Sequence, residues 1–317
     1  MSNSKFPIDL ALTDVSVAYK NGDLIADRVS PIVGVPRSTG HYWEWARAES
    51  VRRGASLRAN GGESQRVKFS AEKKAFSTEE YAFHIGITEK DRNDSDPSLD
   101  IETSETESLT RLLLTDREYR VADFFRNTAN YESGLSETFS GTSQWDNAGY
   151  TGDPLKQIDE RRQEVRRACG YYPNVLILSP EAAVALGNNA SFRDHYKYTK
   201  DDVANGESLP PVIKGMTVII STAQGAEGND GDNTLTDIWG KDMIMVYTNP
   251  NGKMKEVSFS YTLRRKQLVG TNAYGIVTRK WDDIGTKTTK IEVEVDEVIQ
   301  SIAKGAGFIV KDVVANA

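Results

Sequence analysis

The sequence predicts an α+β fold that combines half-buried strands, one long helix and a compact α/β lobe. Residues 81–88 and 291–296 alternate between apolar and polar side chains, as strands with one buried face do. An apolar stripe with the helical period runs through residues 105–130. From about residue 151 to 255, short apolar runs separated by a helical pattern predict the α/β lobe.

Length and composition exclude several classes of protein. The chain has 317 residues, which is enough for two domains of about 150 residues each. No apolar run approaches the ~18–20 residues that span a bilayer, and residues 1–10 lack the pattern of a secretory leader. We therefore expect no membrane partner. The formal net charge of -7 disfavours a surface that wraps nucleic acid.

The first 40 residues are interpreted as an extended N-terminal arm. Pro7, Pro31 and Pro36 interrupt residues 1–40, and the apolar residues there follow no strong period. Such a segment cannot cover its own apolar side chains. We therefore expect them to be buried against something else.

Residues 41–80 predict a β-hairpin that protrudes from the body as an extended loop. The dipeptide Asn60-Gly61 in its middle is typical of tight hairpin turns, because these residues tolerate positive φ angles. Almost every position is polar, so little apolar surface would hold the hairpin against its own domain.

Charge is unevenly distributed along the chain. Residues 46–74 hold eight basic and three acidic residues, whereas residues 91–123 hold ten acidic and four basic residues. One interpretation is that the two segments are solvated faces of one domain. The other is that one segment docks on the other, within or between subunits. The candidate interface residues are Arg52, Arg53, Arg58, Lys68, Lys73, Lys74, Glu102, Glu105 and Glu107.

A long helix is expected in the next domain, residues 81–150. Ser104 and Glu107 have the spacing of a capping box, and the helix would extend over about residues 105–130. At about 1.5 Å per residue, ~26 residues make a rod of about 39 Å.

Residues 151–284 are expected to form the domain that contains the α/β lobe. Asp153 and Pro154 have the spacing of a helix start, and Gly170 that of its end. The lone cysteine, Cys169, follows the helical period and is interpreted as a core residue. Residues 257–263 and 291–296 predict antiparallel strands with one face toward water. The final segment, 285–317, is expected to return to the domain of the long helix.

Motifs that carry chemistry are absent from the sequence. It contains no nucleotide-binding glycine loop, no nucleophile elbow and no H-E-x-x-H pattern. His41, His84 and His195 lie far apart, without metal-ligand spacing. We therefore expect no catalytic residue, no cofactor and no metal.

The order of the segments resembles the major capsid proteins of tailed bacteriophages, whose shell fold is shared with encapsulins and the herpesvirus capsid floor. No single motif carries this resemblance, which covers roughly residues 8–310. The matching segments are residues 15–20, 25–31 and 35–36 in the arm, 87–92 and 96–97 before the long helix, Trp145, 153–155, Ile158, Val165, 173–176 and Ser179 in the next unit, and 238–241 later.

The resemblance implies an N-terminal arm, an extended loop, a peripheral domain with a long spine helix, and an α/β axial domain. It implies a structural protein of the virion that forms pentamers and hexamers of an icosahedral head around double-stranded DNA, without sequence-specific binding. The arm and the loop would lie on neighbouring subunits. A separate scaffolding protein, a portal and possible decoration proteins would be the other partners, and assembly would take place in the bacterial cytoplasm.

Two alternatives stay open at this point. An encapsulin-type nanocompartment has the same fold but encloses an enzyme. A soluble α/β enzyme is less favoured, because the catalytic motifs are missing and the hairpin has no core of its own.

Overall fold

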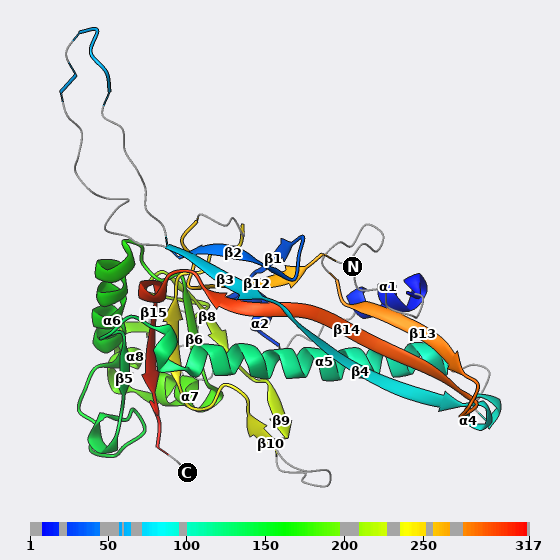
Figure 1. The fold of residues 1–317 in the computed structure, drawn as a ribbon. Helices are drawn as coiled ribbons and strands as arrows, with labels where there is room; N and C mark the ends of the chain where they lie inside the picture. Colours follow the sequence, from blue (N-terminus) through cyan, green and yellow to red (C-terminus); the bar gives the residue numbers. More distant parts are fainter. Residues whose placement is uncertain are drawn as a thin grey trace.

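The computed structural model describes residues 8–18, 24–44, 57–58, 60–64, 72–94, 100–196, 209–226, 235–251, 256–266 and 275–315. The molecule is elongated, with a compact body at one end and a long sheet that reaches away from it, backed by one helix (Figure 1). Among the described helices, none is apolar over enough of its length to cross a membrane.

The long sheet is built around one central strand. Strand β14 (Thr288–Ser301) pairs antiparallel with β4 (Glu79–Thr88) along the whole length of β4. The other edge of β14 pairs first with β13 (Val277–Asp283) and then with β12 (Ser260–Arg265), which itself pairs with β1 (Ile32–Val35) in parallel. The alternation predicted over residues 81–88 is confirmed, since the odd-numbered side chains from Tyr81 to Ile87 lie in an apolar cluster and the even-numbered ones are exposed.

The long helix α5 (Ile101–Arg126) covers one face of this sheet, which we call the inner face. Its Leu109 and Leu113 pack against Ile291, Val293 and Val295 of β14. Its 26 residues match the expected length, but the helix begins and ends about four residues earlier than predicted. Asp100 is the N-cap, because its side chain accepts a hydrogen bond from the Thr103 amide, and the predicted capping box at Ser104 lies inside the helix.

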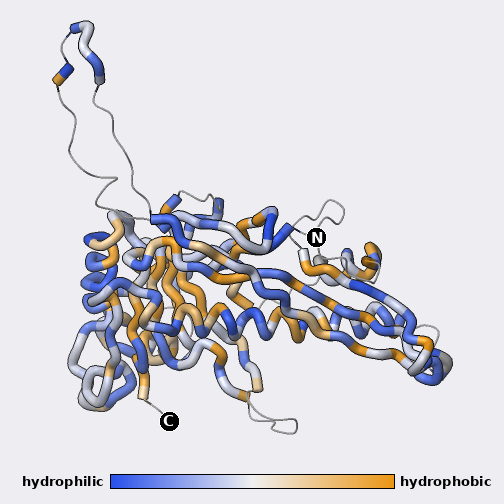
Figure 2. The backbone as a smooth tube through the Cα atoms, viewed as in Figure 1, coloured by the Kyte–Doolittle hydropathy of each residue, from blue (hydrophilic) through white to orange (hydrophobic). Residues whose placement is uncertain are grey.

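A second sheet of six strands forms the compact body. Its order is β5 (Ser136–Thr138), β15 (Gly307–Lys311), β11 (Met243–Val246), β6 (Val175–Leu178), β8 (Met216–Ile220) and β7 (Val212–Ile213). Figure 2 shows that apolar residues concentrate in its strands. Helices α7 (Pro180–Asn188) and α8 (Ala190–Tyr196) belong to this body.

Helix α6 (Pro154–Cys169) begins and ends at the residues that the sequence predicted. The Asp153 side chain accepts a hydrogen bond from the Leu155 amide at 3.0 Å, and Gly170 ends the helix with a φ of 88°. Cys169 is buried in the core, as expected.

The strands divide between the two sheets differently from the predicted domain limits. Strands β12 and β13, inside residues 151–284, belong to the long sheet, and β15, inside residues 285–317, belongs to the body. Smaller elements are the two-stranded sheet of β9 (Gln224–Ala226) and β10 (Leu235–Asp237), and helix α4 (Glu89–Asp94) at the far tip of the long sheet (Figure 1).

The N-terminal segment is not an extended arm in its described part, and this corrects the sequence interpretation. It forms helices α1 (Leu10–Ala18) and α2 (Ala26–Val29) before β1. Leu12, Ile25 and Val29 are buried in the apolar cores of their own chain and do not need a second subunit to cover them. The sequence of α1 shows no clear apolar period because part of its buried face is polar: the hydroxyls of Thr13 and Ser16 bond to Thr278 and Thr110.

The predicted hairpin has a paired base. Strands β2 (Thr39–Glu44) and β3 (Glu72–Ser77) form an antiparallel ribbon, and the described residues near the turn lie far from both sheets (Figure 1). Gly61 has the positive φ of 81° that the turn signal predicted. Tyr42 and Phe76 of the ribbon pack with Val298 of β14, on the side of the long sheet that α5 does not cover, which we call the outer face.

Candidate functional site: a buried charge cluster and the surfaces around it

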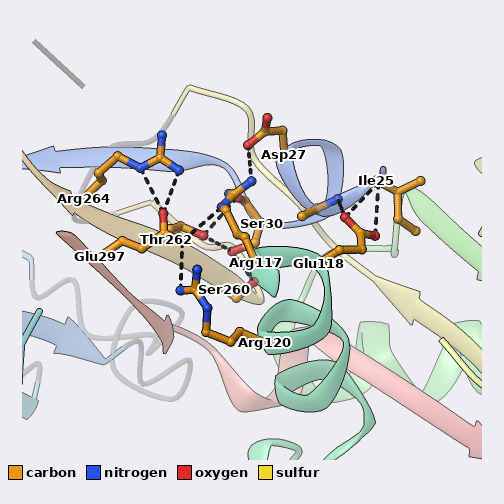
Figure 3. Close-up of polar contacts among 11 residues, drawn as sticks. Ile25, Asp27, Ser30, Arg117, Glu118, Arg120, Ser260, Thr262, Arg264 and Glu297 are labelled. Carbon is orange, nitrogen blue, oxygen red and sulfur yellow. Dashed lines mark hydrogen bonds and ion pairs between the residues drawn. The ribbon is translucent and has the colours of Figure 1, made fainter. Parts of the chain in front are cut away.

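A buried carboxylate with three arginines lies where the long helix meets the long sheet. The side chain of Glu297 on β14 is 0% exposed and faces α5. Arg264 of β12 donates to it through Nε and Nη2 at 2.9 and 2.6 Å, and Arg120 of α5 donates through Nη1 at 3.0 Å (Figure 3). Arg117 of α5 forms an ion pair with Glu297 at 3.2 Å and donates to Asp27 of α2 at 2.6 Å. We call these five residues the Glu297 cluster.

Three members of the cluster are buried: Glu297, Arg117 and Arg264 have side chains 0%, 3% and 7% exposed. Burial alone would raise the pKa of Glu297, but Arg117, Arg264 and Arg120 lower the pKa to about 2. Glu297 is therefore ionised at neutral pH. A buried charge is tolerated only when it is paired and hydrogen-bonded, and this carboxylate has three cationic partners from two elements.

A second buried carboxylate, Glu118, connects three parts of the chain. It lies on α5 and accepts hydrogen bonds from the backbone amides of Ile25 and Ala26, at 3.1 and 2.9 Å, where the N-terminal segment enters α2. The Trp239 indole, which packs in the core of the body, donates to it at 2.6 Å. Burial raises the pKa of Glu118, and these donors partly offset that rise. Glu118 thus joins the N-terminal segment, the long helix and the body.

The polar face of β12 is buried by the same junction. Thr262 and Ser260 form hydroxyl hydrogen bonds with Ser30, at 3.0 and 3.2 Å, between α2 and β1 (Figure 3). The sequence predicted a wet face for β12 and β14. On β12 this is wrong, because Ser260, Thr262 and Arg264 are buried; on β14, Glu294 and Asp296 are buried whereas Glu292 is partly exposed. Partners from distant segments make that burial possible.

A weak sequence signal for the cluster exists. On β14 the inward side chains are Ile291, Val293 and Val295, so the next inward position is Glu297. A carboxylate in register with an apolar face needs a cationic partner wherever that face is covered. The arginines could not be assigned to it from sequence, because Arg264 and Glu297 are 33 residues apart and Arg120 and Glu297 are 177 apart.

The described members of the predicted interface lie in two separate elements, the β2–β3 hairpin and the start of α5. Lys74 forms an ion pair with Glu44 across the β2–β3 ribbon, and Lys73 lies over the Trp43 ring. Arg58 near the hairpin turn is exposed and donates to the Gly62 carbonyl. Arg52, Arg53 and Lys68 lie outside the described residues.

The acidic candidates lie at the start of α5. Glu102 already has cations from its own chain, at 2.5 Å from Lys280 and 2.7 Å from Arg92. Glu105 is half-buried and Glu107 is exposed. The described part of one chain therefore does not bring the basic hairpin to the acidic segment. Across the described ranges, no group of three His, Cys, Asp or Glu side chains is arranged to hold a metal ion.

The fold is the one found in solved structures of phage capsids and encapsulins. A phage-related protein from Bordetella bronchiseptica RB50 has a similar structure, with a TM-score of 0.76, 19% identity and coverage of 98% of this chain and 99% of the other. The SrpI encapsulin from Synechococcus elongatus PCC 7942 has a TM-score of 0.59 at 12% identity, with coverage of 98% and 97%.

The family follows from the sequence comparisons. A family model described as phage major capsid protein E matches residues 125–296, more than half of the chain. The major capsid protein of Pseudomonas phage JBD67 is 28% identical over 250 residues, which cover 78% of this chain and 79% of that protein. The major capsid protein of Burkholderia phage BcepMu is 24% identical over 271 residues, with coverage of 82% and 84%. The chain belongs to the phage major capsid protein E family and is a structural subunit of a capsid.

Proposed function

We propose that this chain forms pentamers and hexamers that close into an icosahedral phage head around double-stranded DNA, and that it acts without catalysis. The observation that supports this most directly is the β2–β3 ribbon, whose described tip lies far from its own body (Figure 1). A long polar hairpin gains little stability from its own chain. A neighbouring subunit would supply the missing contacts.

We further propose that the head holds its DNA loosely. Each phosphate that a protein neutralises releases a counterion and strengthens binding. This chain has a net charge of -7, so its acidic side chains outnumber the basic ones that could neutralise phosphates. The head would then enclose the DNA without sequence-specific binding. A separate scaffolding protein, a portal and decoration proteins are the expected partners, with assembly in the bacterial cytoplasm and the virion as the final location.

The hairpin is proposed to contact a neighbouring subunit through ion pairs. The basic residues of segment 46–74 would meet carboxylates of a second copy, since the described acidic candidates of the same chain lie elsewhere. Single exposed ion pairs contribute about 0–1 kcal/mol each, so several must act together.

Expression of the full chain, alone and with its scaffolding protein, tests the proposal. Gel filtration and electron microscopy should show capsomers or closed particles of megadalton size. A species that stays at the subunit mass of 35.1 kDa in both preparations would contradict it. In a gel-shift titration, the purified subunit should bind duplex DNA no more tightly than about 10⁻⁴–10⁻⁶ M at physiological salt.

The encapsulin-type compartment is a second candidate, because the SrpI structure covers nearly the whole chain. The contents of particles purified from the native source distinguish the two functions. Duplex DNA supports the phage head, whereas a single enriched cargo enzyme supports the compartment.

A further inference from the structure

Asn60 and Gly61 form an exposed turn in the described part of the hairpin, far from both sheets (Figure 1). Gly61 has a φ of 81°, in the left-handed region that glycine adopts without strain. A Cβ added at Gly61 would meet no atom within 4 Å, so no other part of the chain packs against the turn there. The backbone conformation of the turn therefore favours glycine directly after Asn60, and both residues are open to water.

A glycine that follows an asparagine makes the pair chemically labile, because no side chain hinders the glycine nitrogen. Once the Gly61 amide has lost its proton to a base in the solvent, its nitrogen can attack Cγ of Asn60. The new bond joins the Gly61 nitrogen to Cγ, the bond from Cγ to the side-chain nitrogen breaks, and that nitrogen leaves as ammonia. Water then adds to either carbonyl of the cyclic succinimide and opens it to aspartate or isoaspartate. The reaction needs only water, and the backbone at the asparagine must rotate to reach it.

The hydrogen bonding of the turn leaves that rotation unopposed. The Arg58 guanidinium donates to the Gly62 carbonyl, on the far side of the Asn60–Gly61 peptide bond. Of the hydrogen bonds formed between described residues, none includes the Asn60 side chain or the Gly61 amide. Exposed loop tips of this kind are where backbone motion is least restrained.

A second Asn-Gly pair is held differently. The chain contains four such pairs, at residues 21–22, 60–61, 205–206 and 251–252. Asn21 and Asn205 lie outside the described residues. Asn251 is exposed in the loop between β11 and β12, where its amide donates to Oδ1 of Asn249 at 3.0 Å. The Asn249 amide donates in turn to the Ser258 hydroxyl at 3.3 Å. The backbone at Asn251 is thus restrained by hydrogen bonds that Asn60 lacks.

We propose that Asn60 is a site of spontaneous deamidation, converted through a succinimide with Gly61 to aspartate and isoaspartate, and that the folded chain converts Asn60 faster than Asn251. The inference does not depend on assembly. Its product is ionised at neutral pH, so segment 46–74, with eight basic and three acidic residues, gains a fourth acidic group. Isoaspartate also adds one carbon to the backbone of the turn. Conversion therefore changes both the charge and the backbone of the proposed contact segment.

Incubation of the purified full chain at mildly alkaline pH, followed by peptide mass spectrometry, tests the inference. The Asn60 peptide should gain the mass that separates a carboxyl group from an amide and should separate chromatographically into two products, aspartate and isoaspartate. Conversion in the folded chain should be about fivefold faster at Asn60 than at Asn251, the factor that corresponds to one hydrogen bond of ordinary strength. In urea the two peptides should convert at similar rates, because the hydrogen bond at Asn251 is then lost.

Glycine variants test the mechanism. Gly61→Ala should slow conversion at Asn60 severalfold, because its methyl group hinders the attacking nitrogen. The matched control is Gly86→Ala, which changes a glycine that does not follow an asparagine and should leave the rate at Asn60 unchanged. The melting temperature of Gly61→Ala should equal that of the wild type, since the turn lies away from both sheets.

Three results would overturn the inference. The first is an Asn60 peptide that keeps its mass while the denatured chain converts. The second is equal conversion of Asn60 and Asn251 in the folded chain, which would show that the restraint at Asn251 does not matter. The third is formation of aspartate without isoaspartate, which would exclude the succinimide.

Discussion

Replacement of Glu297 by glutamine removes the negative charge from the centre of the Glu297 cluster while the shape of the side chain is retained. Arg117 and Arg264 stay buried, with side chains 3% and 7% exposed, and lose their shared counterion. Removal of one partner from a buried pair costs about 3–5 kcal/mol. The lowered pKa gives a similar magnitude, because a shift from 4.5 to about 2 corresponds to ~3 kcal/mol at ~1.4 kcal/mol per unit. We therefore expect the free energy of unfolding to fall by about 3 kcal/mol.

Urea unfolding of the unassembled subunit, followed by tryptophan fluorescence and circular dichroism, measures this loss. The control is Glu292→Gln, which changes a carboxylate on the other face of the same strand and should stay within about 0.5 kcal/mol of the wild type. In the Glu297→Gln background, Arg264→Met should recover part of the loss because it removes the excess buried charge. If Glu297→Gln costs no more than Glu292→Gln, the cluster does not stabilise the junction as argued.

Three further predictions follow from the same structure. The contribution of Glu297 is present above pH 4.5 and is lost as the pH falls toward 2, so the unfolding free energy of Glu297→Gln should decline less steeply than that of the wild type in an acid titration over this range. Deletion of residues 1–36 should give an insoluble or unfolded chain, because β1 and the buried side chains of α1 and α2 are lost. Solubility and circular dichroism measure this, and a soluble, folded product would restore the interpretation as a free arm. Gly307→Ala should lower the thermal midpoint, at a cost of about 1–3 kcal/mol, because the added Cβ would lie 2.6 Å from the Phe259 ring. The control is Gly86→Ala, whose added Cβ has its nearest contact at 3.7 Å and which should leave the thermal midpoint unchanged.

The elements that the sequence determined by itself are those with complete local signals. The alternation of β4, the caps of α6 and the continuous apolar run of β6 each depend on neighbours within a few residues, and each formed as predicted. The length of α5 was also correct. Its start differs from the predicted one because Asp100 and Ser104 are both residues that can cap a helix, and in the structure it is Asp100 that accepts the hydrogen bonds from Thr103.

The tertiary structure alone decided which polar residues are buried. Thr13 and Ser16 look like surface residues until Thr278 and Thr110 supply their hydrogen bonds. Helix α1 was therefore interpreted as part of an arm. The two faces of the long sheet are likewise distinguished only by the tertiary structure, which packs α5 on one face and the β2–β3 ribbon on the other.

The Glu297 cluster shows most clearly why the sequence does not predict which charged residues are buried. A glutamate that follows Val293 and Val295 in the inward register could belong to a strand end in water or to a buried ion pair. The choice depends on Arg117, Arg120 and Arg264, which come from two other elements and have no sequence relation to Glu297. Burial of a charge is favourable only after its partners have gathered from distant positions, so no local pattern can predict it.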